Sequence, residues 1–523
     1  MKRFNVTGVC VPAMHYMINT DKKLNKMLKY IEYGDYFYII KPRQYGKTTT
    51  LFLFEQLLNK DEIYTVFSIS FEGMGDEIFL DEALFSKGFL NELAQIQLYE
   101  GTEIAKKILN EVENCNNLSD LSSSITRIIK NQNKKVILII DEVDKSSNNQ
   151  LFVSFLGVLR DKYLKRNQGK DFTFFSVILA GVHDVKTLRI KIRPDEEHKY
   201  NSPWNIATNV DVDFTFKPEE IVTMLDDYQE ETKIKMDEKG ISERIYYFTS
   251  GHPFLVSRVC KEIDEKILPQ RDNKNWVVED VDDAVKNILN EQNTNFEDLI
   301  KNLENNNELL GFITNLVIGR REYNFVALAP LINLGITFGI ISERNSKVVI
   351  QNKIYEEYIT NYLTAKKDFY ADSSIFGNSI QSIYLDENGR LLMDKVLLKF
   401  QEVIKEKYSQ SEILKSDEFL EKDLRLLFLV FLKPIINGVG FSYKEVEIGA
   451  ERRLDIIVIF RDEKFIIELK LWYGQKYHNE GKIRLKKYMI NEGVNKGYML
   501  IMHKNKEKAF TVETEDDILM VWV

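Results

Sequence analysis

The sequence has few of the residues that build special scaffolds, since its 523 residues include only three cysteines and nine prolines. Cys10, Cys115 and Cys260 lie far apart and form no CxxC pair, which argues against a disulfide framework or a thiolate metal cluster. No stretch approaches the roughly 18 consecutive apolar residues of a transmembrane helix, and the most apolar run, Leu426–Leu432, suits a buried helix. Polar residues interrupt the apolar stretch near the N-terminus, which argues against a signal peptide. We therefore expect a cytoplasmic protein with reduced thiols and no membrane partner.

The chain also lacks an excess of positive charge. Its 71 Lys and Arg residues face 80 Asp and Glu residues, and the net charge of −9 argues against a protein that coats nucleic acid by bulk charge. The composition, 44% hydrophobic and 29% charged, is typical of ordinary buried cores. At roughly 100–200 residues per domain, the length predicts about three domains.

Strands and helices alternate over the first 220 residues. The spacing of apolar residues predicts helices at Asp21–Ile31 and Thr48–Leu58. Strand-like runs recur along the same stretch, at Tyr36–Ile40, Thr65–Phe71, Lys135–Ile140, Phe172–Ala180 and Val210–Phe216. This alternation predicts an α/β fold with a mostly parallel sheet covered by helices on both faces.

The pattern turns helical after residue 220, with apolar residues at helical intervals in Pro218–Tyr228 and Glu279–Leu303. A helix, a hairpin within Ile340–Ile350 and a trailing helix at Ile354–Leu363 then suggest a winged-helix-like domain. Lys366–Asn388 is typical of a connector, and a second α/β unit is expected after it.

The sharpest motif, Lys41–Thr48, lies between a predicted strand and a predicted helix. A phosphate loop needs backbone amides around a phosphate, a lysine that reaches the β and γ oxygens, and a hydroxyl on Mg²⁺. Gly46, Lys47 and Thr48 supply the last glycine, the lysine and the hydroxyl, although Lys41 stands where the usual pattern has its first glycine. The motif predicts ATP and Mg²⁺ as cofactors. The other residues assigned to the loop are Arg43, Gln44, Tyr45 and Thr49.

A second motif strengthens the nucleotide hypothesis. The apolar strand Lys135–Ile140 ends in Asp141 and Glu142. Asp141 is suited to the Mg²⁺ shell and Glu142 to polarising the attacking water. The alternative is a core strand followed by an acidic turn, but the combination of the two motifs with strands between and after them favours an ATPase.

These motifs resemble a known family. Tyr36–Leu51 resembles the "RPRQYGKTT" phosphate loop of bacterial AAA-like, STAND-related P-loop ATPases, and Ile178–Val185, Ser202–Ala207 and Gly251–Val256 match further stretches in order. The resemblance implies that His183 or Asp184 lies near the γ-phosphate. It also implies that Gly251, His252 and Pro253 lie near the nucleotide in a helical lid. Arg160 and Arg258 are candidate γ-phosphate arginines, with a solvated helix face as the alternative for each.

Charged residues interrupt two apolar strand-like runs near the C-terminus. Leu454–Ile459 carries Asp455, and Lys464–Lys470 carries Glu468 and Lys470 on one face. Unpaired charge is costly in an apolar strand. If the strands form a hairpin, Asp455 and Glu468 come together, and two carboxylates with a lysine suit Mg²⁺-dependent phosphodiester hydrolysis. The alternative is an exposed hairpin with an ordinary Glu–Lys pair.

This stretch resembles the PD-(D/E)XK nuclease superfamily, in particular the nuclease domain fused behind AAA-like ATPases. The resemblance implies Asp455, Glu468 and Glu421, the glutamate of a preceding helix, as metal ligands and Lys470 as the catalytic lysine. Glu445 and Glu447 are alternatives for an extra ligand. A helix with Gln-Leu-x-x-Tyr usually follows. Here Arg484 replaces that glutamine in Arg484–Tyr488, which leaves the geometry of the site open.

The local charge favours a phosphate partner. Lys470–Lys508 contains ten Lys and Arg against three Asp and Glu, a balance of 10 − 3 = +7. A solvated basic helix explains the charge equally well, but beside a carboxylate site it favours nucleic acid, with DNA as the first expectation. The aromatic residues Trp472, Tyr473 and Tyr477 either stack on bases or pack internally.

Together the motifs predict five segments. They are a P-loop ATPase core at 1–220, a helical lid at 221–304, a winged-helix-like domain at 305–365, a connector at 366–388 and a restriction-endonuclease-like α/β domain at 389–523. The leading hypothesis is an ATP-driven switch coupled to a Mg²⁺-dependent nuclease. From the resemblance we also expect a role in defence against foreign DNA or in mobile-element biology. A homo-oligomer is a further expectation. The rival is a signalling or scaffold ATPase whose C-terminal domain binds nucleic acid or protein without cutting it.

Overall fold

The chain folds into two compact units in the computed structural model. The first unit comprises Met1–Glu291, Ala327–Ser342 and Gln351–Lys353, and the second comprises Gln292–Val326, Glu343–Ile350 and Ile354–Val523. The structure describes residues 2–99, 103–130, 132–146, 150–182, 206–210, 212–291, 293–317, 322–366, 381–408, 421–436, 440–443, 456–461, 463–503 and 510–523. Within those ranges, no helix combines the length and the apolar character that crossing a membrane requires.

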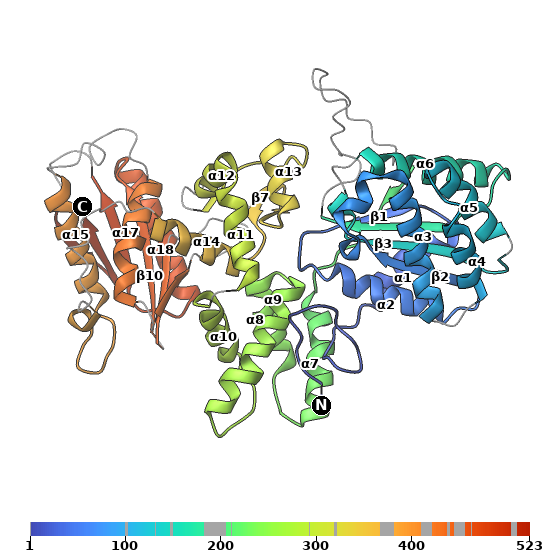
Figure 1. The fold of residues 1–523 in the computed structure, drawn as a ribbon. Helices are drawn as coiled ribbons and strands as arrows, with labels where there is room; N and C mark the ends of the chain where they lie inside the picture. Colours follow the sequence, from blue (N-terminus) through green and yellow to red (C-terminus); the bar gives the residue numbers. More distant parts are fainter. Residues whose placement is uncertain are drawn as a thin grey trace, which may run out of the picture. The chain divides into compact units, whose positions relative to one another are not determined.

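A five-stranded parallel sheet organises the first unit (Figure 1). Its order is β2-β3-β4-β1-β5. The strands are β1 (Phe37–Ile40), β2 (Tyr64–Ser70), β3 (Lys135–Asp141), β4 (Ser176–Gly181) and β5 (Thr208–Asn209). Because β4 lies between β1 and β3, the phosphate loop after β1 and the carboxylates after β3 leave the same edge of the sheet one strand apart.

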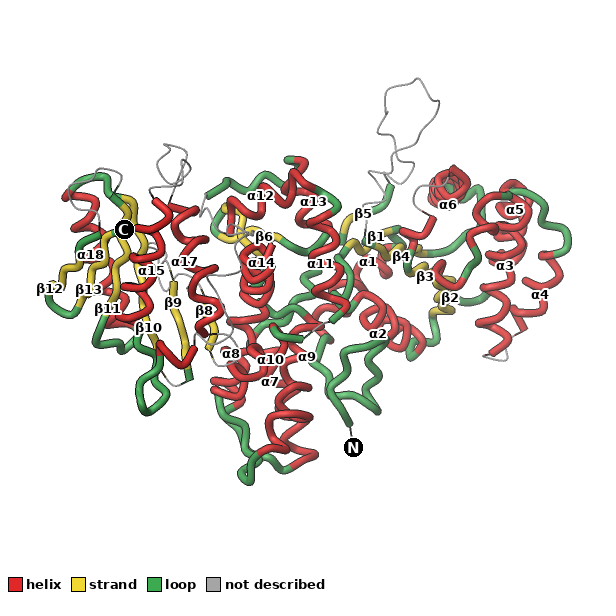
Figure 2. The backbone as a smooth tube through the Cα atoms, turned by 60° about the vertical axis from the view of Figure 1, so that its left-hand side comes forward, coloured by secondary structure: helices red, strands yellow, loops and turns green. Residues whose placement is uncertain are grey.

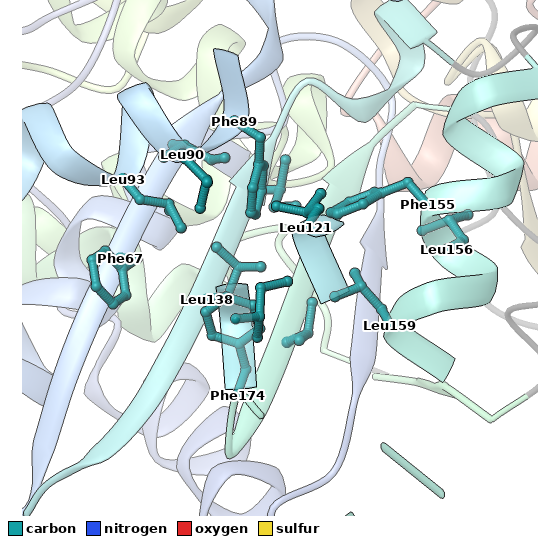
Figure 3. Close-up of a cluster of buried hydrophobic side chains, with 14 of the residues drawn as sticks. Phe67, Phe89, Leu90, Leu93, Leu121, Leu138, Phe155, Leu156, Leu159 and Phe174 are labelled. Carbon is teal, nitrogen blue, oxygen red and sulfur yellow. The ribbon is translucent and has the colours of Figure 1, made fainter. Parts of the chain in front are cut away.

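Helices cover both faces of this sheet, as the sequence predicts. They are α1 (Asp21–Tyr33), α2 (Lys47–Asn59), α3 (Glu82–Tyr99), α4 (Glu103–Val112), α5 (Leu118–Lys130) and α6 (Gln150–Asn167). Leu138 of β3 packs with Phe89 and Phe155 of α3 and α6 on one face (Figure 3). Its neighbour Ile137 belongs to the cluster on the other face, together with Phe54 of α2. Successive strand residues point to opposite faces, so a strand buried on both sides is apolar throughout.

The strand predicted at Val210–Phe216 is wrong, because the fifth strand is Thr208–Asn209. Val210, Val212 and Phe214 are nevertheless buried in the core beneath α1 and α2. Their alternation therefore reflects an irregular segment that turns apolar side chains inward. Asp213 accepts hydrogen bonds from the backbone and hydroxyl of Thr215, which favours a turn over continued pairing.

Four further helices of the first unit cover most of the predicted lid. They are α7 (Pro218–Thr232), α8 (Glu238–Thr249), α9 (Pro253–Glu262) and α10 (Glu279–Leu289). The helical pattern at Glu279–Leu303 is interrupted after α10, and the next helix is α11 (Thr294–Glu304). Asn293 starts that helix by accepting a hydrogen bond from the backbone N–H of Phe296 at 3.0 Å.

The helix, hairpin and helix expected between residues 305 and 365 are confirmed. The elements are α12 (Asn307–Val317), α13 (Pro330–Thr337), β6 (Ile341–Arg344), β7 (Lys347–Ile350) and α14 (Lys353–Lys366). The hairpin turns at Asn345 and Ser346, which both have positive φ angles of 51° and 61°. Two such residues form the tight turn whose twist matches a β-hairpin.

The C-terminal part of the second unit is a six-stranded mixed sheet of order β12-β13-β11-β10-β9-β8 (Figure 2). The strands are β8 (Gly440–Tyr443), β9 (Ile456–Phe460), β10 (Glu463–Leu471), β11 (Gly497–Met502), β12 (Val512–Glu515) and β13 (Ile518–Trp522). The helices are α15 (Met393–Tyr408), α17 (Glu421–Ile436) and α18 (Gln475–Asn491). α15 and α17 share one apolar core with the sheet, and α18 contributes Leu485 and Met489 to a second core.

Candidate functional site

The phosphate loop ends where α2 begins, at Lys47. Gly46 has a positive φ of 74° and Gln44 one of 60°, so the chain turns sharply before the helix. The buried Lys47 amine donates to the carbonyl oxygens of Lys41 at 2.9 Å and Pro42 at 3.2 Å. The Lys47 side chain therefore folds back over the phosphate loop that precedes it in the sequence. Burial lowers the pKa of this amine, and the carboxylates of Glu142 and Asp141 act in the opposite direction.

Thr48 and Asp141 meet at the carboxyl edge of the sheet. The Thr48 hydroxyl donates to Asp141 Oδ2 at 2.8 Å, and Asp141 Oδ1 accepts from the backbone N–H of Glu142 at 2.9 Å. The two side chains lie 93 positions apart in the sequence. A hydroxyl and a carboxylate oxygen are hard donors of the kind that Mg²⁺ takes, so this pair fits the predicted metal.

Glu142 follows Asp141 with a φ of 53°, outside the usual range for a side-chain-bearing residue. Such backbone conformations concentrate at functional positions because they carry strain. Burial raises the pKa of Glu142, and the nearby Lys47 amine counteracts this shift. The geometry places a carboxylate of increased basicity next to the loop lysine, which suits a group that orients or deprotonates a water.

The start of α9 packs against the phosphate loop. The rings of His252 and Tyr45 lie 4.4 Å apart between centroids, and Pro253 lies 3.7 Å from where a side chain on Gly46 would begin. Burial lowers the pKa of His252 to about 3, so its imidazole is neutral. Gly251, at φ 72°, is required because a Cβ there would lie 2.0 Å from the carbonyl oxygen of Phe216. The motif that is predicted to lie near the nucleotide therefore contacts the phosphate loop.

The other residues predicted to bind the nucleotide lie in different environments, and some are outside the described residues. Arg43 is exposed and Tyr45 is buried. The Thr49 hydroxyl accepts a hydrogen bond from the backbone N–H of Cys10 at 3.1 Å, a contact with the N-terminal segment that no motif indicated. His183 and Asp184 lie outside the described residues, as does most of the Ser202–Ala207 match.

Arg258 does not lie on a solvated helix face, so that alternative is wrong. Its guanidinium is buried and forms ion pairs with Glu262, at 3.0 Å, and with Glu291. These two ion pairs hold the guanidinium among the helices of the predicted lid. Arg160 is half-buried on α6.

The second candidate site lies on β10 of the mixed sheet. Glu468 is fully buried and Lys470 is 5% exposed. Their side chains meet, as their spacing predicts, with Lys470 Nζ 3.3 Å from Glu468 Oε1. β9 and β10 form the predicted antiparallel hairpin, and Ile467 pairs with Ile456 at the end of the described ladder. Asp455, the residue before Ile456, lies outside the described residues, as do Glu445 and Glu447.

The tertiary fold adds two side chains from other helices. Glu421, at the start of α17, has its Oε1 3.5 Å from Lys470 Nζ. Arg484 of α18 reaches Glu468 Oε1 with Nε at 3.1 Å and a terminal nitrogen at 2.9 Å. The helix glutamate, the strand glutamate and the lysine of the predicted site are therefore neighbours, and the arginine at the glutamine position touches the strand glutamate directly.

Two further side chains border Glu421. Arg425, 1% exposed in its side chain, lies 3.3 Å from Glu421 Oε1, and the Tyr477 hydroxyl lies 3.5 Å from Oε2. Burial raises the pKa of Tyr477. Sequence analysis missed Arg425, although a charge four residues after Glu421 in a very apolar helix was a usable signal. Tyr477 contacts Lys470 with its ring, 5.3 Å from Nζ to the centroid.

Glu421 and Glu468 offer hard carboxylate oxygens, which suit Mg²⁺ chemically. Among the described residues, however, no group of three or more His, Cys, Asp or Glu side chains is placed to hold a metal ion. Of the predicted ligands, Glu421 and Glu468 lie in the part of the site that the structure describes, and Asp455 lies outside it.

A family model described as an AAA-like domain matches residues 13–361. The chain belongs to the AAA-like domain family. This assignment agrees with the parallel sheet, the loop after β1 and the carboxylates after β3. No curated protein sequence matches the chain.

Several solved structures resemble this AAA-like protein. A Walker-type ATPase of Pyrococcus abyssi is 12% identical, covering 68% of this chain and 99% of that one, with a TM-score of 0.45. The ORC2 protein of Aeropyrum pernix is 13% identical over 66% and 93%, with a TM-score of 0.40. The RuvB Holliday junction branch migration motor of Thermotoga maritima is 11% identical over 64% and 92%, with a TM-score of 0.33. At these TM-scores, none of them carries an argument about substrate or partner.

Proposed function

We propose that this AAA-like protein is an ATP-binding and ATP-hydrolysing switch coupled to a Mg²⁺-dependent nuclease. The observation that carries the first half is the contact of Thr48 with Asp141 beside the buried Lys47. The observation that supports the second half is the convergence of Glu421, Glu468 and Lys470 from α17 and β10. The relation to STAND ATPases and a role in defence against foreign DNA remain expectations from sequence.

In the ATPase half, each proposed role follows from a position. Lys47 exchanges the carbonyl oxygens of Lys41 and Pro42 for phosphate oxygens, while Thr48 and Asp141 hold Mg²⁺, which offsets charge on the phosphates when bound. Glu142 orients the attacking water and takes its proton. The backbone from Arg43 to Thr49 cradles the phosphates. His183, outside the described residues, is the proposed γ-phosphate sensor.

In the nuclease half, Glu468, Asp455 and Glu421 hold Mg²⁺ through carboxylate oxygens. The metal supplies Lewis-acid stabilisation of the charge on the phosphate when bound. Lys470 orients the attacking water or helps to deprotonate it from its position between the two described carboxylates. The +7 stretch from Lys470 to Lys508 supplies a positive surface for the nucleic acid backbone.

A cleavage assay tests the nuclease. Plasmid DNA and single-stranded DNA are incubated with Mg²⁺ and wild type, Asp455→Ala, Glu468→Ala or Glu402→Ala. The first two changes are expected to lower the rate at least about 100-fold, because metal stabilisation of the charged transition state is worth several kcal/mol. Glu402 is exposed on α15, outside the basic stretch, and serves as the matched control, with an unchanged rate. Equal cleavage by all four proteins would overturn the proposed nuclease.

A second candidate function is a signalling or scaffold ATPase whose C-terminal domain binds nucleic acid without cutting it. The observation in its favour is the ion pair of Arg484 with Glu468, which gives a proposed metal ligand a protein partner. This alternative predicts retention of DNA on a native gel together with no cleavage in Mg²⁺ or Mn²⁺.

A further inference from the structure

Charges of both signs are concentrated around β10. The carboxylates of Glu421 and Glu468 contribute −2, while Lys470, Arg425 and Arg484 contribute +3. Among the described residues of this site, cations therefore outnumber carboxylates. A divalent cation placed at Glu468 meets repulsion from the neighbouring cations, and like charges at short range are costly where water is excluded.

Among these cations, Arg484 is the candidate for leaving Glu468, because its side chain is the most exposed. The Glu468 side chain is 1% exposed and the Lys470 side chain 7%, whereas that of Arg484 is 19% exposed. A phosphate arriving from solvent reaches the guanidinium before it reaches the carboxylate. Arginine also matches phosphate with two parallel N–H donors, as it does carboxylate.

We propose that Arg484 is the counter-ion of Glu468 in the absence of substrate and transfers to a substrate phosphate when nucleic acid binds. This inference rests on the proposed nuclease function of the same site. Its consequence is cooperativity, because the departure of Arg484 frees a carboxylate for the metal and removes one positive charge. The metal and the phosphodiester then bind better together than either binds alone.

The size of the coupling follows from the ion pair. A hydrogen bond to a charged group contributes about 1.5–3 kcal/mol, which corresponds to roughly 10- to 100-fold in affinity. Replacing Arg484 by glutamine removes the competing charge. It is therefore expected to tighten Mn²⁺ binding by roughly that factor in the absence of nucleic acid.

The test is a calorimetric titration of the full-length protein with Mn²⁺, with and without a short single-stranded DNA whose linkages are phosphorothioate to resist cleavage. The proteins are wild type, Arg484→Gln, Arg484→Lys, Glu468→Ala and Lys399→Gln. Lys399 lies on α15, outside the basic stretch, and pairs with Glu402 at the surface, so its variant removes one positive charge without touching Glu468. Thermal denaturation checks that each variant is folded.

The proposal expects the DNA to tighten Mn²⁺ binding in wild type and Lys399→Gln, and to have little effect in Arg484→Gln, which binds Mn²⁺ tightly on its own. Arg484→Lys keeps the charge without the two-pronged donor and is expected to fall between them, which preserves the test if Arg484→Gln does not fold. If Glu468→Ala abolishes Mn²⁺ binding while wild type and Arg484→Gln bind equally with and without DNA, the role of Arg484 is overturned and the metal site stands. If no protein binds Mn²⁺ under either condition, both proposals are overturned.

Discussion

Buried lysines face carboxylates at both candidate sites. Lys47 lies beside Asp141 and Glu142, and Lys470 lies between Glu421 and Glu468. Burying such charges costs free energy, and the cost is offset when each charge has a partner at hydrogen-bonding distance. In enzymes, buried ionisable side chains that are paired in this way cluster at reaction centres.

His252 gives the first unit a defined response to acid. Its folded pKa of about 3 lies below the ordinary value of 6.5, so the unfolded chain binds a proton that the folded chain does not between those pH values. Stability is therefore complete above about pH 6.5 and is lost as the pH falls. Lowering the pH from about 7 to about 5 is expected to cost about 2 kcal/mol through this residue alone.

Denaturation of wild type and His252→Gln at both pH values measures this effect. The glutamine does not titrate, so the variant is expected to lose less stability on acidification than wild type. An identical loss in the two proteins would show that His252 titrates normally in the folded chain.

At the scale of elements, the phosphate loop is braced from two directions within the first unit. His252 and Pro253 at the start of α9 contact Tyr45 and Gly46. The turn after α13 brings Gly339 so close that a side chain there would begin 2.9 Å from Pro42 and 3.2 Å from Tyr45. A change in the loop on nucleotide binding must therefore be accommodated by both neighbours, since closely packed groups do not deform freely.

Gly339→Ala tests the second brace. Gly339 has a φ of 68°, so alanine adds backbone strain and overlaps Pro42, at a combined cost of about 1–3 kcal/mol. The expected result is a lower melting temperature together with several-fold weaker ATP binding, although residue 339 lies far from the motif in sequence. Gly157→Ala in α6 is the matched control, because nothing lies within 4 Å of the added carbon. Unchanged ATP binding by a destabilised Gly339→Ala would mean that this turn does not influence the loop.

For the whole molecule, the net charge of −9 conceals an uneven distribution. The Lys470–Lys508 stretch carries +7, so the remainder of the chain carries −9 − 7 = −16. Positive charge is therefore concentrated in one stretch of a chain whose remainder is acidic.

The proposed switch predicts that nuclease activity depends on nucleotide. ATP is expected to change the cleavage rate of wild type, and Lys47→Ala is expected to remove that response along with ATP binding. Glu142→Gln keeps the loop and is expected to bind ATP while hydrolysing it at least about 100-fold more slowly, because it lacks the base that the water needs. ATP binding, ATP turnover and DNA cleavage by the three proteins, measured in parallel, separate a switch driven by binding from one driven by hydrolysis.

If Lys41, at the position of the usual first glycine, prevents hydrolysis, wild type and Glu142→Gln will show the same turnover. A cleavage rate that is the same with and without ATP in all three proteins would contradict the coupling.

The sequence by itself determined the features that depend on neighbouring residues. The spacing of apolar residues gave β1 and α2 around the phosphate loop, and β3 ahead of Asp141, to within a residue or two. The two-residue spacing of Glu468 and Lys470 placed their side chains together because strand side chains alternate. The strand predicted at Val210–Phe216 was wrong for a physical reason. Alternating apolar residues indicate which side chains are buried, but they do not show whether the backbone forms strand hydrogen bonds.

Only the tertiary structure decided which distant side chains share a site. Glu421 contacts Lys470, which lies 49 positions away in the sequence. Arg484, which departs from the expected glutamine, forms an ion pair with Glu468. Gly339, in the turn after α13, and His252, just before α9, likewise lie against the phosphate loop. Such contacts depend on how helices pack on a sheet, and packing is set by the shape and burial of many side chains at once. No local pattern along the chain encodes it.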